Sequence, residues 1–268
     1  MTTHRALVTN DDGISSEGLR WLASSAIESG LEVVVAAPLR ESSGTSASLT
    51  AVQADGRIVV ERWSIAGLDR VEAYGVDAVP GFIALIATRG AFGNPPDIVL
   101  SGINLGLNTG HAVLHSGTVG AAMTARVHGC RALAVSLAVG ETLHWDTAAD
   151  VARHAIGWLL DIDHPVVLNV NVPNVAVDEL RGVRQGELAA FGAVQTTIAE
   201  VGEGFVRVGV ADVRDELQPG SDAALVAEGY ASVTPLSPLC ESTDLILPVN
   251  GVSLSSYAEP RTSSPGTR

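Results

Sequence analysis

The sequence predicts an α/β fold with a mostly parallel sheet, and three observations support this prediction. Short apolar segments alternate with segments of helical periodicity over residues 1–178. Turn-forming Gly, Pro, Asn and Asp residues separate the segments. Hydrophobic residues make up 46% of the 268 residues and aromatic residues only 4%, so Ala, Val and Leu must fill a layered core. Strands that alternate with helices are joined by right-handed crossovers and therefore run parallel.

The first strand, helix and strand occupy the start of the chain. Residues 6–8 are apolar and predict a short buried strand. Apolar residues recur at helical spacing over 16–29, and Gly30 follows, which predicts a helix that ends there. The apolar run 32–37 predicts a second strand. The later segments predict short strands at 57–62 and 71–74, a helix at 80–88, strands at 98–100 and 130–138, a helix at 146–160 and a strand at 165–172.

The pattern changes after residue 178, and we divide the chain there. Residues 1–178 are the expected catalytic core. Residues 179–260 are expected to hold an irregular stretch at 182–192, a β-hairpin arm and an oligomerisation segment. The hairpin strands are expected at 195–201 and 205–213, followed by a helix at 221–229 and a strand at 230–236. The tail 261–268 is polar and is expected to be disordered.

The charge and the cysteine content exclude several classes of protein. The formal net charge is −14 and the isoelectric point about 4.8, which argues against binding to a nucleic-acid duplex or to an anionic membrane. We find no signal peptide and no apolar run of membrane-spanning length. Two cysteines do not make a disulfide framework. We therefore expect a cytoplasmic protein.

Two adjacent carboxylates follow the first strand. The segment 10–13 reads Asn-Asp-Asp-Gly, so Asp11 and Asp12 lie at the carboxyl end of a strand, where parallel sheets bind ligands. The two carboxylates repel each other unless a cation neutralises them. A hard divalent metal, Mg²⁺ or Mn²⁺, suits such oxygen ligands. The alternative is a solvated turn of a common kind.

Two further loops supply candidate ligands for the same metal. The loop 40–50 is rich in hydroxyl groups and follows the second strand, which makes Ser43 a candidate oxygen ligand beside Gly44. Asn104 follows the strand at 98–100 as Asp11 follows the first strand, so its amide oxygen could reach the same cation.

A candidate phosphate site follows Asn104. The segment 101–111 is rich in Gly, which lets backbone amides approach an anion, and the segment 116–119 opens an Ala-rich helix. The free N–H groups at a helix start suit a phosphate. Ordinary helix capping by Ser116 and Thr118 is the alternative. The spacing matches neither a dinucleotide fingerprint nor a nucleophile elbow.

Five motifs in order resemble the SurE family of metal-dependent nucleoside monophosphate phosphatases. They lie at 8–13, 43–50, 101–108, 116–122 and 229–236. The resemblance implies a Rossmann-like three-layer core, an extended arm, and a C-terminal exchange between subunits of a homodimer or homotetramer. It also implies one divalent metal per subunit. The metal ligands it implies are Asp11, Asp12, Ser43 and Asn104, and the residues bordering the phosphate are Asn108, Ser116, Gly117 and Thr118, with Asn10 and Gly44 beside them.

We therefore expect hydrolysis of nucleoside 5′(3′)-monophosphates, with Asp11, Asp12 and Asn104 as catalytic residues. Asp11 or Asp12 could orient the attacking water. His111 and His115 are candidates for acid or base catalysis because they lie between Asn104 and the phosphate-binding helix. His115 stands where the family commonly has Tyr, and residues 181–201 lack basic and aromatic residues typical of the arm. These departures keep two alternatives open: a phosphatase for another phosphorylated metabolite, and a non-catalytic nucleotide-binding protein.

Overall fold

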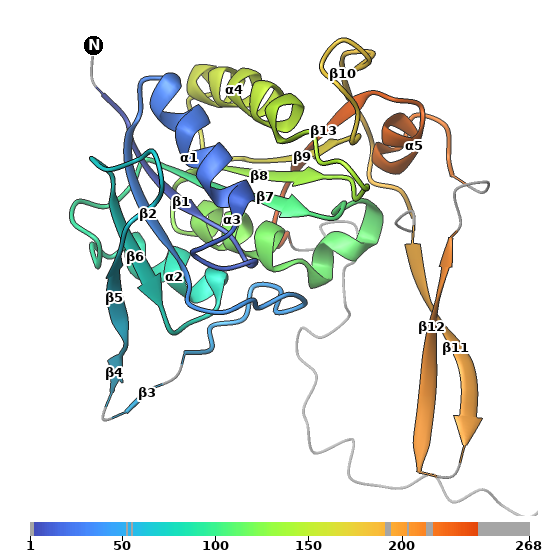
Figure 1. Ribbon diagram of the computed structural model, residues 1–268, viewed down its shortest axis with the longest axis horizontal. Helices are drawn as coiled ribbons and strands as arrows, with labels where there is room; N and C mark the ends of the chain where they lie inside the picture. The colour runs from blue at the N-terminus through green and yellow to red at the C-terminus, as the bar shows by residue number, and fades with distance from the viewer. Residues whose placement is uncertain are drawn as a thin grey trace, which may run out of the picture. The chain divides into compact units, whose positions relative to one another are not determined.

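A nine-stranded sheet forms the centre of the protein (Figure 1). The computed structural model describes residues 3–51, 53–54, 56–190, 194–202, 204–212 and 217–240. The strand order is β10-β13-β9-β8-β7-β1-β2-β6-β5. The strands are β1 (Arg5–Thr9), β2 (Glu32–Pro38), β5 (Val60–Trp63), β6 (Glu72–Val76), β7 (Ile98–Leu105), β8 (Arg131–Leu137), β9 (Val167–Val172), β10 (Val183–Gln185) and β13 (Ala231–Leu236).

The order of the strands reverses between β1 and β7. Six neighbouring strands, β6-β2-β1-β7-β8-β9, are parallel, and β5 and β13 join the two sides of this group in antiparallel fashion. The chain runs from β1 outward to β2 and β6, then returns to β7 on the other side of β1. In open parallel sheets, ligands bind at the carboxyl ends of the two strands where the order reverses. The predicted Rossmann-like sheet is confirmed.

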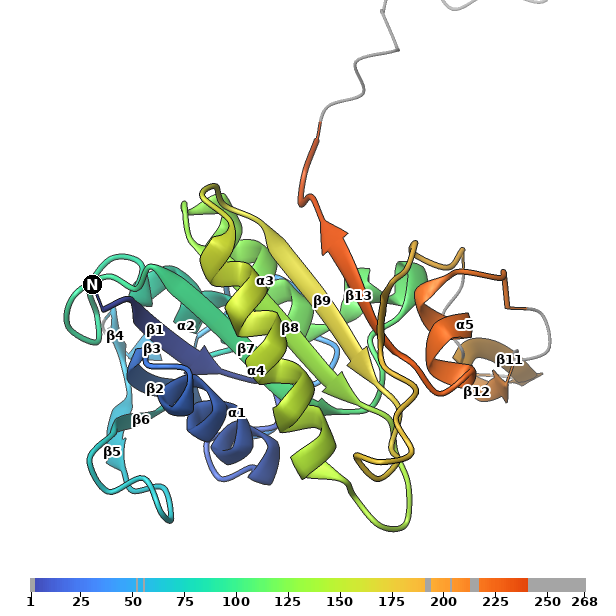
Figure 2. The same cartoon turned by 90° about the horizontal axis from the view of Figure 1, so that it is seen from above.

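Helices cover both faces of the sheet and complete three layers (Figures 1 and 2). Helices α1 (Glu17–Glu28) and α4 (Trp145–Asp161) pack side by side on one face, where Leu22 and Ile156 are fully buried. Helices α2 (Pro80–Ala87) and α3 (Gly117–Val127) cover the other face through Ile83 and Val119. Burial on both faces explains why the parallel strands read as continuous apolar runs.

Helix starts follow local sequence signals. The hydroxyl of Ser16 accepts a hydrogen bond from the N–H of Leu19 and caps α1. Pro80 is the first residue of α2, where its missing N–H costs nothing. Ser221 caps the short helix α5 (Asp222–Ala227) in the same way as Ser16 caps α1. No helix within the described residues is both long enough and apolar enough to cross a membrane.

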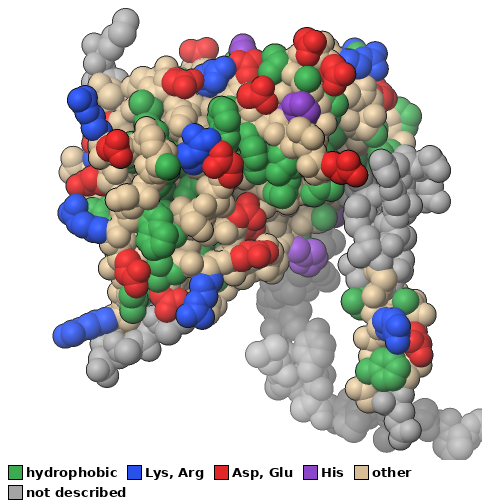
Figure 3. Space-filling view, viewed as in Figure 1, with side chains coloured by type: hydrophobic (Ala, Val, Ile, Leu, Met, Phe, Trp, Pro, Cys, Tyr) green, Lys and Arg blue, Asp and Glu red, His purple; other side chains and the backbone are tan. Residues whose placement is uncertain are grey.

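The predicted β-hairpin is confirmed. Strands β11 (Val194–Gly202) and β12 (Phe205–Asp212) pair in antiparallel fashion, with an irregularity between Ile198 and Glu200. A second, much smaller hairpin joins β3 (Gln53–Ala54) to β4 (Arg57–Ile58). On the large hairpin, green apolar side chains lie beside a basic and an acidic one in Figure 3. Four apolar side chains on this hairpin are between 57% and 71% exposed: Ile198, Val201, Val206 and Val208.

Several elements differ from the sequence expectations. Strand β7 continues to Leu105, so Asn104 belongs to the strand instead of following it. A 3-10 helix, η1, forms over Gly110–His115, and β10 forms within the stretch 182–192 that was expected to be irregular. The sheet therefore continues past residue 178, although the proposed domain division remains a prediction. The expected tail 261–268 and most of the oligomerisation segment, from residue 241 onward, lie outside the described residues.

The two cysteines differ in exposure, and this difference predicts a difference in reactivity. Cys130 is buried at the start of β8, and its thiol lies 3.2 Å from the carbonyl oxygen of Pro96. Burial, reinforced by the negative charge of Asp97, raises the pKa of this thiol to about 11. Cys240 is exposed. At pH 8, we expect a thiol reagent such as DTNB to modify Cys240 quickly and Cys130 only after denaturation, because the thiolate is the reactive form. Rapid modification of both thiols in the native protein, measured by absorbance and mapped by mass spectrometry, would contradict the buried position of Cys130.

Candidate functional site

The turn after β1 is fixed by the side chain of Asn10. Asn10 is fully buried, and its amide nitrogen donates to the carbonyl of Gly13 (3.2 Å) and to the hydroxyl of Ser16 (2.5 Å). Its amide oxygen accepts from the N–H of Gly13 (3.2 Å). The amide group of Asn10 therefore shapes the turn and joins it to the start of α1.

The carboxylate of Asp11 points into the start of α3. It is only 3% exposed, and one of its oxygens accepts a hydrogen bond from the hydroxyl of Thr118. Burial raises the pKa of Asp11, while hydrogen bonds from the Thr118 side chain and from the backbone of Thr118 and Gly117 oppose that rise. The carbonyl of Asp11 accepts from the N–H of Ser42 at 2.8 Å. Asp11 thus connects the first strand, the second loop and α3.

Asp12 lies beside the end of β7. Burial raises the pKa of Asp12 to about 6, and the negative charges of Asp11 and Glu41 add to this effect. A hydrogen bond from the backbone of Leu105 acts in the opposite direction. Two neighbouring carboxyl groups whose pKa values are both raised favour a bound proton or a bound cation.

Asn104 is brought next to this acidic pair. It directly precedes Leu105, whose backbone bonds to Asp12, and its amide nitrogen donates to the carbonyl of Gly106 at 2.6 Å. The amide oxygen is consequently the atom that Asn104 can offer to a cation. Because β1 and β7 pair in parallel, their carboxyl ends lie at the same edge of the sheet.

Ser43 and Gly44 take a more exposed position in the second loop. The hydroxyl of Ser43 donates to Glu41 at 2.9 Å, and both Ser43 and Gly44 are exposed. Ser42, which bonds to the backbone of Asp11, attaches this part of the loop to the acidic turn. The structure therefore brings the loop to the site while the Ser43 hydroxyl bonds to a neighbouring carboxylate.

The first turn of α3 packs directly against Asp11. The Ser116 hydroxyl accepts from the N–H of Val119 at 3.1 Å and caps the helix. A Cβ atom added at Gly117 would lie 2.7 Å from a carboxylate oxygen of Asp11. One turn further along the same side of the helix, the backbone of Ser46 lies so close to Gly120 that a Cβ there would collide with it. Small residues in α3 allow the acidic turn and the second loop to meet at the helix start.

Asn108 is held by polar side chains at the ends of β8 and β9. Its N–H donates to Asn171 (2.8 Å), and its carbonyl accepts from Asn169 (2.8 Å) and Asn171 (3.0 Å). Its own amide nitrogen donates to the hydroxyl of Ser136 at 2.8 Å. Asn169 and Asn171 were missed from the sequence, although two buried Asn residues at period two in an apolar strand were a usable signal.

The loop beyond Asn108 contains the two candidate histidines. His111 and His115 are both exposed on η1. The N–H of Gly110, where η1 begins, donates to the buried carboxylate of Asp222 at 2.8 Å. Asp222 lies 112 positions later in the sequence, in α5, and sequence reasoning gave it no role. Burial raises its pKa, and hydrogen bonds from the backbone of Gly110, Ala189 and Ala223 limit the rise.

The chemistry of these donors fits a hard divalent cation. Asp11 and Asp12 supply carboxylate oxygens at the end of β1, and Asn104 supplies a neutral oxygen at the end of β7. Among the described residues, no group of three or more His, Cys, Asp and Glu side chains is arranged to hold a metal. A cation here would depend on the acidic pair together with neutral oxygen ligands, which is a common arrangement for Mg²⁺.

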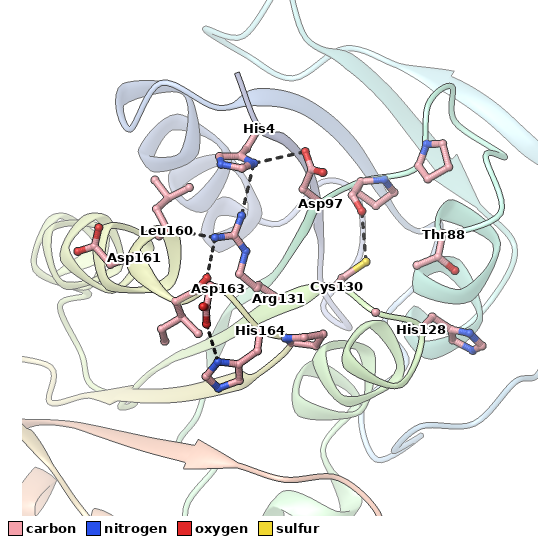
Figure 4. A pocket seen from close by; sticks show the side chains of 15 residues that line it. His4, Thr88, Asp97, His128, Cys130, Arg131, Leu160, Asp161, Asp163 and His164 are labelled. Atoms are coloured by element: carbon pink, nitrogen blue, oxygen red, sulfur yellow. Dashed lines mark hydrogen bonds and ion pairs between the residues drawn. The ribbon is translucent and has the colours of Figure 1, made fainter. Parts of the chain in front are cut away.

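A separate cavity of about 540 Å³ opens at the opposite edge of the sheet (Figure 4). It lies at the amino ends of the parallel strands, and several of its polar groups are bonded to one another or to backbone. Arg131 donates to the carbonyls of Leu159, Leu160 and Ile162, and His4 lies 3.6 Å from Asp97. This arrangement closes the carboxyl end of α4, so we interpret the cavity as structural.

The contact between Gly117 and Asp11 predicts a clear effect of Gly117→Ala. We expect the added methyl group to push α3 away from Asp11 and to lower the free energy of unfolding by about 1–3 kcal/mol. Gly157→Ala is the matched control, because a Cβ at this exposed position of α4 meets no atom within 4 Å. The control should stabilise the protein by about 0.5–1 kcal/mol. Urea denaturation of both variants measures the difference, and equal effects would refute the close packing at Gly117.

Comparison with known proteins identifies the family of this chain. The family model "Survival protein SurE" matches residues 6–193. Proteins named 5′-nucleotidase SurE are 36% identical in Aeromonas hydrophila (87% of this chain, 92% of that protein) and 37% identical in Nitrosococcus oceani (87% and 90%). The crystal structure of the SurE protein from Aquifex aeolicus superposes with a TM-score of 0.72 at 30% identity, over 87% of this chain and 92% of that one. The chain therefore belongs to the SurE family.

Proposed function

We propose that this protein is a metal-dependent phosphatase that hydrolyses nucleoside 5′(3′)-monophosphates to nucleoside and phosphate. One observation carries the proposal: the carboxylate of Asp11 lies directly against the first turn of α3, and Asp12 follows it at the carboxyl edge of the sheet. A cation site beside a helix start is suited to a phosphate group. The nucleotidase names of the relatives in Aeromonas hydrophila and Nitrosococcus oceani support a nucleotide as the substrate.

The residues at the site then have distinct roles. Asp11, Asp12 and the amide oxygen of Asn104 would hold one Mg²⁺ or Mn²⁺, with Ser43 close by in the second loop. When bound, the cation would neutralise charge on the phosphoryl group and lower the pKa of a bound water. The oxygens of Asp12 that remain free can orient that water. At the start of α3 the N–H groups of Gly117 and Thr118 bond to Asp11, so the helix would favour a phosphate through its positive end.

The departure at His115 favours testing a second substrate class. A phosphorylated metabolite other than a nucleotide would use the same acidic pair and helix start. A non-catalytic nucleotide-binding protein would bind nucleotide without releasing phosphate.

The two free cysteines support the cytoplasm as the proposed compartment, because neither forms a disulfide.

Phosphate release from a mixed panel tests the function. The panel contains nucleoside 5′- and 3′-monophosphates, sugar phosphates and an aryl phosphate, each with Mg²⁺, with Mn²⁺ and with a chelator. We expect nucleoside monophosphates to give the highest kcat/KM, and the chelator to abolish turnover because charge on the phosphoryl group is then not neutralised. A preference for sugar phosphates would support the second substrate class. Nucleotide binding in calorimetry without phosphate release would support the non-catalytic alternative.

The substitution Asp12→Asn tests the role of the acidic pair without disturbing the rest of the fold. We expect it to lower metal-dependent phosphate release by about 100-fold or more, because a cation ligand loses its charge. The melting temperature should not fall, since the substitution removes the repulsion between Asp12 and Asp11. Asp178→Asn, at an exposed position away from the site, should leave activity unchanged. Activity of Asp12→Asn at the parent rate would show that the acidic pair is not the site.

We also propose that the protein is a homodimer or homotetramer assembled through the hairpin. In the antiparallel register Ile198 faces Val208 and Val201 faces Val206, so these four exposed apolar side chains share one face of the hairpin, which we call the apolar arm face. The pair Glu200 and Arg207 occupies the opposite face. A two-stranded hairpin is marginally stable alone, and an exposed apolar face is suited to a partner.

Charged residues on the apolar arm face should therefore weaken assembly. We expect Val206→Glu combined with Val208→Glu to lower the mass measured by light scattering to that of a smaller species, because the carboxylates would have to be buried without a partner. Arg207→Gln, on the opposite face, is the control and should keep the parent mass. If the double variant also keeps the parent mass, the apolar arm face is not the interface.

A further inference from the structure

A fully buried carboxylate in the first turn of α5 is bound by three backbone N–H groups. One oxygen of Asp222 accepts from Gly110 (2.8 Å), and the other accepts from Ala189 (3.1 Å) and Ala223 (2.8 Å). Such charge-assisted hydrogen bonds are stronger than neutral ones, and a buried carboxylate needs them. Neither the acidic pair nor the proposed phosphate-binding turn contains this residue.

The three donors come from different parts of the chain. Ala189 lies shortly before the hairpin strand β11, whereas Ala223 belongs to α5, which follows β12. The N–H of Asp222 in turn donates to the carbonyl of Glu187 at 2.7 Å. Asp222 therefore joins the segment that enters the hairpin to the segment that leaves it. We call this group of contacts the arm base.

The third donor belongs to the loop beside the proposed site. Gly110 is two residues beyond Asn108, and Thr109 between them is 2% exposed. Asn108 is held on the sheet side by Asn169 and Asn171. The loop is thus fixed at Asn108 by the sheet and at Gly110 by the arm base. A change at the arm base would be transmitted to this loop by a single direct hydrogen bond.

We propose that Asp222 is a positioning residue that holds the loop 108–110 in place for substrate binding and couples that loop to the arm base. This proposal rests on the proposed phosphatase function. Asp222 acts through the backbone of Gly110 and does not contact the acidic pair. A carboxylate is suited to this role because it has two acceptor oxygens. One accepts from Gly110, and the other accepts from Ala189 and Ala223.

Asp222→Asn tests this role with almost no change in shape. An amide has one acceptor oxygen, whereas a carboxylate has two. If the amide oxygen introduced by this substitution accepts from Ala189 and Ala223, its NH₂ group faces the N–H of Gly110, and two donors then oppose each other. Ser221→Ala is the matched control, because it removes the cap of the same helix and leaves the bond to Gly110 intact. Asp222→Ser, which retains a single hydroxyl acceptor, replaces Asp222→Asn if the latter does not fold.

Three measurements on the full-length chain decide the proposal. In Asp222→Asn we expect amide hydrogen exchange of the segment 106–113 to be about tenfold faster, since a charge-assisted hydrogen bond is lost. We expect KM for a nucleoside monophosphate to rise about tenfold while kcat changes less than about threefold. The mass from light scattering should equal that of the parent. Ser221→Ala should match the parent in the exchange of 106–113 and in KM.

Specific outcomes would overturn the proposal. Exchange of 106–113 that is equal in Asp222→Asn and Ser221→Ala would show that Asp222 does not hold the loop. A rise in KM that occurs only together with a loss of mass would assign the effect to assembly. A parent protein that releases no phosphate would refute the proposed function, and hydrogen exchange alone would then decide whether Asp222 positions the loop.

Discussion

The contact between Asp11 and the first turn of α3 organises the functional edge of this protein. The carboxylate is buried, bonds to the Thr118 hydroxyl, and lies so close to Gly117 that a side chain there would displace it. A buried charge of this kind is costly unless donors or a cation surround it. The first turn of α3 packs against this carboxylate, the second loop bonds to the backbone of Asp11, and the end of β7 bonds to the neighbouring Asp12.

Much of the fold could be predicted from the sequence because its strands are buried on both faces. The continuous apolar runs of β1, β2 and β8 are unambiguous once helices alternate with them. Strand β10 has only three residues, two of them polar, and its pairing with β13 depends on a partner almost 50 positions away. The end of β7 reads as a loop because Ser101 and Gly102 resemble a turn, yet Gly102 packs against the backbone of Val135.

The candidate site, like the fold, contains some residues that the sequence reveals and others that it does not. Asp11, Asp12 and Asn104 could be found because the carboxyl ends of parallel strands meet at one edge, so that topology alone brings these residues together. Asn171 left only the signal of a polar residue in an apolar strand, and Asp222 left none, since their roles depend on contacts with Asn108 and Gly110, which lie 63 and 112 positions away. In sequence Asp222 looks like an ordinary acidic residue in the first turn of a helix. Short motifs predict candidate ligand-binding residues, whereas the long-range contacts that support them are seen only in the structure.

The neighbouring strands β10 and β13 have a consequence for how this architecture can vary. The two strands pair directly, and the hairpin and α5 all lie between them in sequence. The chain thus departs from the sheet and rejoins it one strand away. An excursion of this kind can lengthen, shorten or change its surface without altering the order of the other strands. The surface of the arm can therefore change while the edge of the sheet that carries Asp11 and Asp12 keeps its structure, provided that the contacts at Asp222 are kept.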